Sequence, residues 1–128
     1  MKEEGQDRLD ALRERLRSFV RERDWEQFHS PKNLAMAMIV EAAELVEHFQ
    51  WATEQESHEL GPEKRAKVEQ EIADTFIYLL RLSDVLGVDL IEAAHRKMDL
   101  NAEKYPAEKV RGRNDKYTEY QSSEPDSR

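Results

Sequence analysis

The sequence predicts an all-α protein made of four helices. Apolar residues recur every three or four positions in four separate segments, which is the period of one face of an α-helix. Typical helix start and stop signals, such as Ser-Pro, Gly-Pro and an isolated Gly, fall between these segments. No segment alternates apolar and polar residues as a half-buried strand does. We expect residues 1–110 to form one helical domain, and residues 111–128 to be a polar tail that is flexible or packs on a neighbouring subunit.

The first two helices are joined by a short aromatic connector. Leucine, phenylalanine and valine residues at helical spacing predict the first helix over about residues 4–23. The connector, residues 24–29 (DWEQFH), is unusually aromatic for its length. Ser30 is a typical N-cap residue and Pro31 suits a first helical turn, so the second helix is expected from there to about Thr53.

The last two helices have equally clear boundaries. The third is predicted over about residues 62–86, after a polar linker, and Gly87 suits its C-terminal end. The fourth is expected over about residues 89–105, because Asp89 and Glu92 have the spacing of a capping box. A proline directly after this segment would end the helix.

Composition and charge limit the partners of the chain. The net charge of −8 argues against a nucleic-acid polymer as partner, because phosphate backbones are bound by clustered Lys and Arg. No apolar run reaches membrane-spanning length and the first residues lack a signal-peptide core, so we expect no membrane partner and a cytoplasmic location. The absence of cysteine agrees with that location. Only 38% of the residues are hydrophobic, and such domains often complete their core by oligomerising.

Two pairs of acidic residues form the candidate chemical site. Glu41-x-x-Glu44 and Glu71-x-x-Asp74 each place two carboxylates on one helix face. If the second and third helices pack antiparallel, the four carboxylates converge at one partly buried edge. Carboxylates that close repel each other unless a cation lies between them. Mg²⁺, with Mn²⁺ as a possible substitute, prefers such oxygen ligands and keeps positions for water and phosphate, so the pattern indicates a phosphate-handling enzyme.

Two other interpretations of the acidic residues stay open at this point. Such pairs are also common on solvated helix faces, so a non-enzymatic helical interaction module is an alternative. Glu92-x-x-His95 matches half of the di-iron helical-bundle signature. Only one such pair occurs in the sequence, and Glu92 already has a predicted capping role.

The residues around the acidic pairs resemble a known family. Four segments look like the dCTP pyrophosphatase branch of the all-α nucleoside triphosphate pyrophosphatases, the MazG-like superfamily: residues 23–51, 71–79 (EIADTFIYL), 97–106 (KMDLNAEKYP) and 116–120 (KYTEY). The resemblance implies a four-helix bundle protomer that assembles into a homotetramer, with a dimer as the other possibility. It also implies Mg²⁺-dependent hydrolysis of dCTP, or of a modified dCTP, to dCMP and pyrophosphate. Another nucleotide, such as dUTP or a damaged triphosphate, is the alternative substrate.

The resemblance also implies roles for individual residues. The metal ligands and catalytic acids would be Glu41, Glu44, Glu71 and Asp74. Substrate contacts would come from Trp25, Glu26, Gln27, Phe28, His29, Trp51 and Tyr78 at the nucleoside, and from Lys97, Asn101 and Lys104 at the phosphates. Judged from the residues alone, the aromatic side chains could equally be core or interface, and the Lys-Asn-Lys face could be a solvated stripe. Leu16 stands where animal members of the branch have a histidine that contacts substrate.

Overall fold

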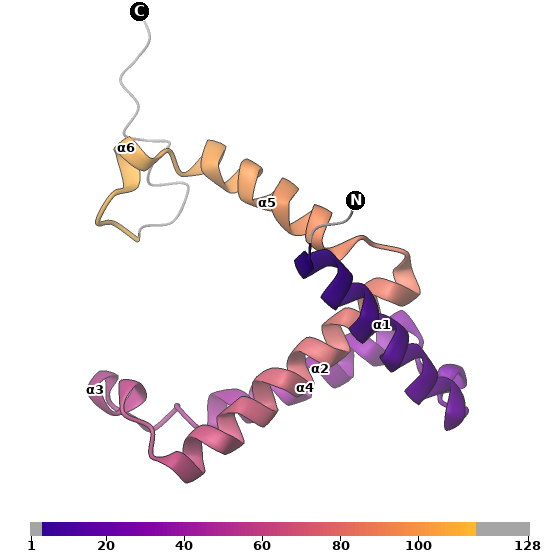
Figure 1. The fold of residues 1–128 in the computed structure, drawn as a ribbon. Coiled ribbons are helices and arrows are strands. Elements are labelled where there is room, and N and C mark those ends of the chain that lie inside the picture. The colour runs from indigo at the N-terminus through magenta and orange to yellow at the C-terminus, as the bar shows by residue number, and fades with distance from the viewer. Residues whose placement is uncertain (1–3, 115–128) are drawn as a thin grey trace, which may run out of the picture. The chain divides into compact units, whose positions relative to one another are not determined.

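All regular structure in the described part of the chain is helical. The structure, a computed structural model, describes residues 4–114. In chain order the elements are α1 (Glu4–Glu22), the 3₁₀ helix η1 (Glu26–Phe28), α2 (Pro31–Glu47), α3 (Glu54–His58), α4 (Pro62–Leu86), α5 (Leu90–Lys104) and α6 (Ala107–Val110) (Figure 1). No strand occurs within residues 4–114, and the predicted all-α class is confirmed. None of the helices in this range is both long and apolar enough to cross a membrane.

The chain divides into two compact units, one ending at Asp89 and the other starting at Leu90. The first unit contains α1 to α4 and the second contains α5 and α6. Most of the predicted tail, and the whole KYTEY segment, lie outside the described residues. The prediction of a single domain over residues 1–110 therefore stays a prediction.

In the first unit, α2 and α4 lie side by side and α1 packs against α4 (Figure 1). The pair is antiparallel. His29, two residues before α2, contacts Arg81 in the last third of α4, and His48, directly after α2, lines a pocket with Pro62 at the start of α4. The most buried apolar side chains come from all three helices: Leu9, Val20, Leu34, Val68 and Leu80. This packing brings the middle of α2 against the middle of α4, where the acidic pairs are located.

The predicted start of α2 is confirmed in detail. The Ser30 hydroxyl accepts a hydrogen bond from the Asn33 N–H at 3.2 Å, and Pro31 occupies the first turn. Serine thus satisfies one of the N–H groups that the first helical turn leaves without a backbone partner. The same start fixes the register of α2, and with it the direction of its acidic side chains.

The helices α1 and α4 end in the same hydrogen-bond pattern. After α4, the Val88 N–H donates to the Ser83 carbonyl at 2.8 Å and the Gly87 N–H donates to the Asp84 carbonyl at 3.1 Å. Gly87 has φ +69°, the left-handed conformation that this Schellman motif requires. After α1 the residue in that conformation is Asp24, with φ +53°, so the chain turns sharply into the aromatic connector.

The predicted end of α2 at Thr53 is wrong by six residues. The helix ends at Glu47, and the N–H groups of Phe49 and Gln50 both turn to the Val46 carbonyl. Thr53 instead caps the short helix α3, because its hydroxyl accepts the Glu56 N–H at 3.1 Å. The Thr-x-x-Glu pattern is a capping box inside the stretch that was predicted as helix end and linker.

Besides the 3₁₀ helix η1, two short α-helices were not predicted, whereas the bounds of the four long helices otherwise agree within about a residue. They are α3, inside the predicted linker, and α6, which follows the proline that ends α5. Each has at most one helical turn and a half, so neither produces the apolar periodicity on which the prediction depended.

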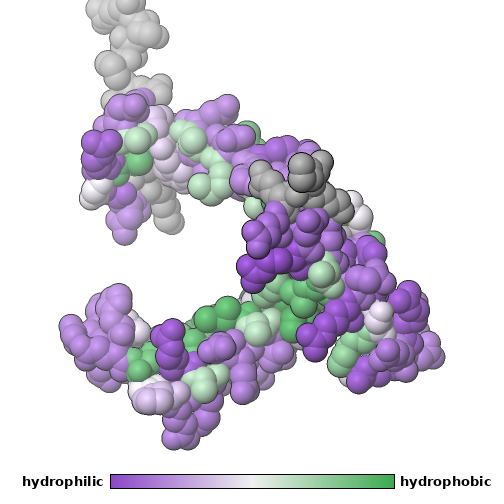
Figure 2. All heavy atoms as spheres, in the orientation of Figure 1, coloured by the Kyte–Doolittle hydropathy of each residue, from purple (hydrophilic) through white to green (hydrophobic). Residues whose placement is uncertain are grey.

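The buried core of the chain is small. Among residues 4–114 only five apolar side chains are buried, and Leu80 is the most buried of them. In contrast, Ile72 on α4 is 54% exposed and Ile39 on α2 is 61% exposed. Figure 2 shows hydrophobic residues gathered in a band along the α2 and α4 pair. A surface this apolar usually marks an interaction site.

Candidate functional site

Three of the four predicted acidic residues meet between α2 and α4. Glu41 and Glu44 come from one face of α2, and Glu71 comes from α4. One carboxylate oxygen of each lies within 4.8 Å of the others. The antiparallel packing of the two helices brings the two acidic pairs to the same level. Three oxygen ligands at this spacing could hold a divalent metal ion.

The electrostatics of this acidic cluster favour a bound cation. Burial, together with the neighbouring carboxylates, raises the pKa of Glu41 from 4.5 to about 7. Burial and the adjacent Glu44 also raise the pKa of Glu71. The Oε2 atom of Glu71 is buried and has no hydrogen-bond partner among residues 4–114. A buried carboxylate oxygen without a partner is costly, and a cation would satisfy it, so the donor set fits a hard metal ion.

Asp74, the fourth predicted acid, lies next to the cluster and not inside it. Its side chain is exposed, and it is not one of the three residues within 4.8 Å. Its negative charge nevertheless raises the pKa of both Glu41 and Glu71. Asp74 therefore lies within electrostatic reach of the other three acids.

Asp74 also lines a cavity of about 440 Å³ between α1, the connector and α4. The lining residues are Leu12, Arg15, Leu16, Phe19, Val20, Trp25, His29, Asp74, Ile77, Tyr78 and Arg81. This volume is in the range of small-molecule sites. Four predicted site residues thus share one cavity, and Asp74 connects that cavity with the acidic cluster. Leu16, the noted departure from the family pattern, lies in the same wall.

The aromatic wall of the cavity is held in place by contacts within the connector. The rings of Phe19 and Trp25 meet edge to face, with centroids 5.8 Å apart and planes at 73°. The Arg23 guanidinium stacks on the Phe19 ring, with its central carbon 3.7 Å from the ring centroid. The left-handed turn at Asp24 makes this packing possible because it folds Trp25 back toward α1. Trp25 remains 43% exposed, so part of its ring is free to contact a ligand.

His29 joins the connector to α4. Its Nδ1 accepts a hydrogen bond from Nε of Arg81 at 3.2 Å. Burial lowers the pKa of His29, and the charge of Arg81 lowers it further. Both effects favour the neutral imidazole at pH 7.

The other predicted residues lie outside this cavity. Glu26, Gln27 and Phe28 form η1, and the Gln27 amide donates to the carbonyl and carboxylate of Asp24. Trp51 falls within the range predicted for α2, but the helix ends four residues before it, and Trp51 is 89% exposed. The predicted placement of Trp51 on α2 is therefore wrong.

The phosphate-binding candidates all lie in the second unit. Lys97, Asn101 and Lys104 are on α5, at positions i, i+4 and i+7. This spacing puts them on one face of the helix. Their predicted role remains a prediction.

Arg81 was missed from the sequence, although a signal for it existed. It stands seven residues after Asp74 and three after Tyr78, so all three share one face of α4. Tyr78 was the last of the predicted site residues on α4. The next turn of the same helix face carries the arginine that contacts His29.

The sequence profile of the MazG-like family matches residues 36–120. Among characterised proteins, the chain is 44% identical to dCTP pyrophosphatase 1 of Homo sapiens over 113 residues, and 42% identical to its counterpart in Mus musculus. Both alignments cover 87% of this chain and 66% of the relative, so the chain spans just under two thirds of the length of these relatives.

A solved structure also resembles this chain. The crystal structure of a pyrophosphatase from Archaeoglobus fulgidus DSM 4304 is similar, with a TM-score of 0.74 and 45% sequence identity. The match covers 77% of this chain and 93% of that one. The sequence profile, the close relatives and the helical fold agree, and the chain belongs to the MazG-like family.

Proposed function

We propose that this chain is a Mg²⁺-dependent nucleoside triphosphate pyrophosphohydrolase that converts dCTP, or a modified dCTP, to dCMP and pyrophosphate. The observation that carries this proposal is the acidic cluster of Glu41, Glu44 and Glu71 beside an aromatic-lined cavity, with Asp74 next to both. A site for a nucleoside triphosphate needs both parts, because the metal-bound phosphates and the base must be held at once. The similarity to dCTP pyrophosphatase 1 supports dCTP as the substrate.

The acidic cluster would hold the metal. Its ligands would be Glu41, Glu44 and Glu71, completed by Asp74. When bound, Mg²⁺ would neutralise the triphosphate and lower the pKa of a water molecule; Mn²⁺ could replace it. The unsatisfied Oε2 of Glu71 supports this assignment, since a cation is the partner that it lacks.

The chain's own side chains would orient the reacting groups. Water attacks the α-phosphorus, the bond to the bridging oxygen of pyrophosphate breaks, and the proton of the water needs an acceptor. Glu44 is our candidate acceptor, because its carboxylate neighbours those of both Glu41 and Glu71. The proton transfer and the bond cleavage together yield dCMP and pyrophosphate.

The remaining predicted residues would hold the nucleotide. Trp25 and Trp51 offer faces on which a base can stack, and Tyr78 offers a hydroxyl at the cavity wall. The connector residues Glu26, Gln27 and Phe28 would complete the base pocket. On α5, Lys97, Asn101 and Lys104 would contact the phosphates.

We further propose a homotetramer, with a dimer as the alternative, located in the cytoplasm. The exposed apolar side chains of α2 and α4 support an assembly. The absence of cysteine agrees with a reducing compartment. The net charge of −8 agrees with a free nucleotide as the substrate and not a nucleic-acid polymer.

A panel of triphosphates tests the reaction and its substrate. Purified protein with Mg²⁺ should convert dCTP to dCMP and pyrophosphate faster than it converts dUTP or the ribonucleotides. Chromatography separates the nucleotides, and a pyrophosphate assay identifies the second product. Release of dCDP and inorganic phosphate would refute the proposed bond, and faster turnover of another triphosphate would refute the proposed base.

Substitution of the acids tests the metal site. Glu41→Gln and Asp74→Asn should each lower kcat/KM by about 10²-fold or more, because metal stabilisation of the reacting phosphates is worth several kcal/mol. Glu47→Gln and Glu69→Gln, which change exposed acids on the same two helices, serve as matched controls. Full activity of Glu41→Gln would refute the ligand assignment.

A further inference from the structure

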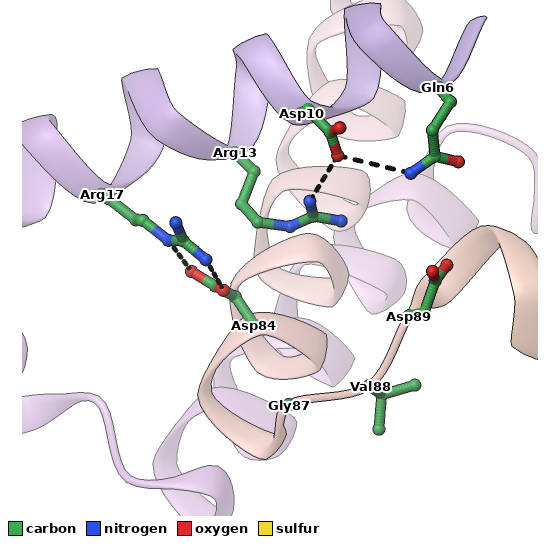
Figure 3. Close-up of a pocket in the computed structure, with 8 residues that line it drawn as sticks. All are labelled: Gln6, Asp10, Arg13, Arg17, Asp84, Gly87, Val88 and Asp89. Carbon is green, nitrogen blue, oxygen red and sulfur yellow. Dashed lines mark hydrogen bonds and ion pairs between the residues drawn. The ribbon is translucent and has the colours of Figure 1, made fainter. Parts of the chain in front are cut away.

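A chain of side chains connects α1, the end of α4 and the connector before α2. Arg17 donates two hydrogen bonds to Asp84, from Nε to Oδ2 at 2.7 Å and from Nη2 to Oδ1 at 2.5 Å (Figure 3). Asp84 also pairs with Arg81, at 3.5 Å from Oδ2 to Nη1. The Nε of Arg81 then donates to Nδ1 of His29. The order of contacts is therefore Arg17, Asp84, Arg81 and His29.

The residues in the middle of this series of contacts are largely buried, next to the cavity that Trp25 and Tyr78 line. The side chains of Arg81 and Asp84 are only 11% and 12% exposed. Their charges are thus less screened than those of a surface pair, and each needs its partner. The hydrogen bond to Arg17 holds the pKa of Asp84 below its usual range, so Asp84 stays charged at neutral pH.

Arg17 and Asp84, the first two residues of this series of contacts, line the polar cavity of about 400 Å³ shown in Figure 3. Its two arginines are both engaged by aspartates: Arg13 contacts Asp10 at 2.7 Å, and Arg17 contacts Asp84 (Figure 3). Neither guanidinium is therefore available as a ready-made anion site. What this cavity supplies is a fixed position for Asp84.

The contact between Arg81 and His29 fixes where the imidazole carries its hydrogen. The Nε of arginine always carries a hydrogen and can only donate. Nδ1 of His29 must then be the acceptor, which leaves the hydrogen on Nε2. The neutral ring therefore offers a donor at Nε2, and the lowered pKa of His29 agrees with this form.

We propose that Arg81 is a positioning residue that holds His29 as a neutral Nε2–H donor to an acceptor atom of the bound nucleotide. The proposal rests on the proposed function, since His29 lines the same cavity as Trp25 and Tyr78. His29 would select for a nucleotide with an acceptor at this point, and it would not act as a general base. The other charged or titratable residues of the cavity wall are Arg15, Asp74, Tyr78 and Arg81.

Nitrogen-15 NMR of the histidine rings in the full chain tests the assignment directly. In the parent protein, His29 should show only the Nε2–H tautomer and a pKa below that of free histidine. Arg81→Met removes the donor, so both tautomers should appear and the pKa should rise. Arg81→Lys, which keeps a charged donor, should restore part of the parent spectrum. Arg65→Met, at an exposed position of the same helix, should change nothing.

A weaker variant covers the case in which Arg81→Met does not fold. Arg17→Gln leaves Arg81 in place but loosens Asp84, so the pKa of His29 should shift in the same direction by less. A hydrogen on Nδ1 of His29 in the parent protein would overturn the proposal. The proposal would also be overturned if the His29 spectrum of Arg17→Gln equals that of the parent while Arg81→Met either does not fold or gives the same spectrum.

Nucleotide binding tests the second half of the proposal. Saturating dCMP with Mg²⁺ should shift the Nε2–H signal of His29, and an unchanged signal would overturn the role of the donor. Arg81→Met should raise KM for dCTP about tenfold while kcat changes less, because one hydrogen bond of binding is lost. If the parent protein hydrolyses no triphosphate but His29 still shows only the Nε2–H tautomer, the proposed function alone is contradicted. Mixed tautomers in an active parent enzyme would contradict the role of Arg81 alone.

Discussion

At the scale of single residues, the carboxylates of the candidate site repel one another when no cation is bound. Glu41 has a pKa of about 7 because it is partly buried beside other carboxylates, and Glu71 has one buried oxygen without a partner. Like charges brought together in this way destabilise the folded chain. The same crowding prepares the oxygens for a metal ion, so it is the expected cost of a binding site.

The stability of the metal-free protein should therefore depend on pH through Glu41. Its pKa is raised from 4.5 to about 7, so between these values the folded chain binds more protons than the unfolded chain. This contribution to the free energy of unfolding is fully present below about pH 4.5 and is lost as the pH rises through 7. Glu41→Gln, whose side chain is neutral at every pH, should remove this loss. The variant should then be more stable than the parent at pH 8 by about 1 kcal/mol or less, since solvent screens these groups.

Thermal unfolding with a chelator, followed by circular dichroism from pH 4 to pH 8, measures this difference. The two proteins should be equally stable at pH 4, and Glu47→Gln should behave like the parent throughout. Addition of Mg²⁺ at pH 8 should raise the unfolding midpoint of the parent and have less effect on Glu41→Gln. A constant difference between parent and variant across this pH range would contradict the prediction.

Residue spacing predicted part of the site where a helix carried the information, and the family resemblance added Trp25 and His29 of the connector. Glu41, Glu44 and Glu71 were predictable because helical spacing fixes the direction of side chains on a helix face. Trp51 was placed wrongly because it lies past the end of α2. The contact between Arg81 and His29 joins residues 52 positions apart, and no local pattern encodes such a distance.

At the scale of the elements, the turns that end two helices each lie beside a cavity: the turn at Asp24 beside the aromatic cavity and the turn at Gly87 beside the polar one. The chain leaves α1 at Asp24 and leaves α4 at Gly87, in each case through a residue with positive φ. The first turn directs Trp25 toward the cavity, and the second follows directly on the segment that carries Asp84. These turns thus fix where the functional faces of both helices begin and end.

Gly87→Ala should lower the free energy of unfolding by about 1 kcal/mol, because an L-residue is strained in the left-handed conformation. No atom lies within 4 Å of the added Cβ, so the loss would come from backbone strain and not from a clash. Gly5→Ala is the matched control: it is equally uncrowded but lies in α1, where alanine should add about 0.5 kcal/mol. Urea unfolding at a fixed protein concentration measures both, and equal effects of the two substitutions would contradict the explanation.

The long helices were predictable because their signals agree with one another. Ser30 with Pro31 marks a start, Gly87 marks an end, and the apolar period continues between such marks. The end of α2 was missed because the apolar period continues to Phe49, whereas the backbone turns earlier to let Thr53 cap α3. In that segment a local hydrogen bond of a side chain outweighs the periodic pattern.

At the scale of the whole molecule, the isolated chain leaves too much apolar surface in water. The five apolar side chains that are buried among residues 4–114 form a small core, whereas Ile39, Val46 and Ile72 are each more than half exposed. Burial of such side chains in an interface would supply the stabilisation that the core lacks. The composition supports the same proposal, since a domain with few hydrophobic residues commonly shares a core with its partners.

Light scattering at micromolar concentration should therefore give a mass of about four times 15.1 kDa, or twice that value for a dimer. Ile39→Glu should lower the mass or the unfolding midpoint, because it places a charge in the apolar band of α2. Gln70→Glu, at an exposed residue of α4 about 160° around the helix from Ile72, is the control. A particle of 15.1 kDa at all concentrations would contradict the proposed assembly.

The arrangement of functional residues along α4 also predicts how this sequence can vary during evolution. Five of them follow one another on this single helix: Glu71, Asp74, Tyr78, Arg81 and Asp84. One residue inserted after Asp74 would rotate everything beyond it by about 100°, which would turn Tyr78 and Arg81 away from the cavity. A single substitution changes one of these side chains and leaves the others in place. A change of length in this stretch would instead move the cavity residues Tyr78 and Arg81 away from the acidic cluster together. Insertions and deletions should therefore accumulate between α2 and α4, where a loop can absorb them, and be absent from residues 71–84.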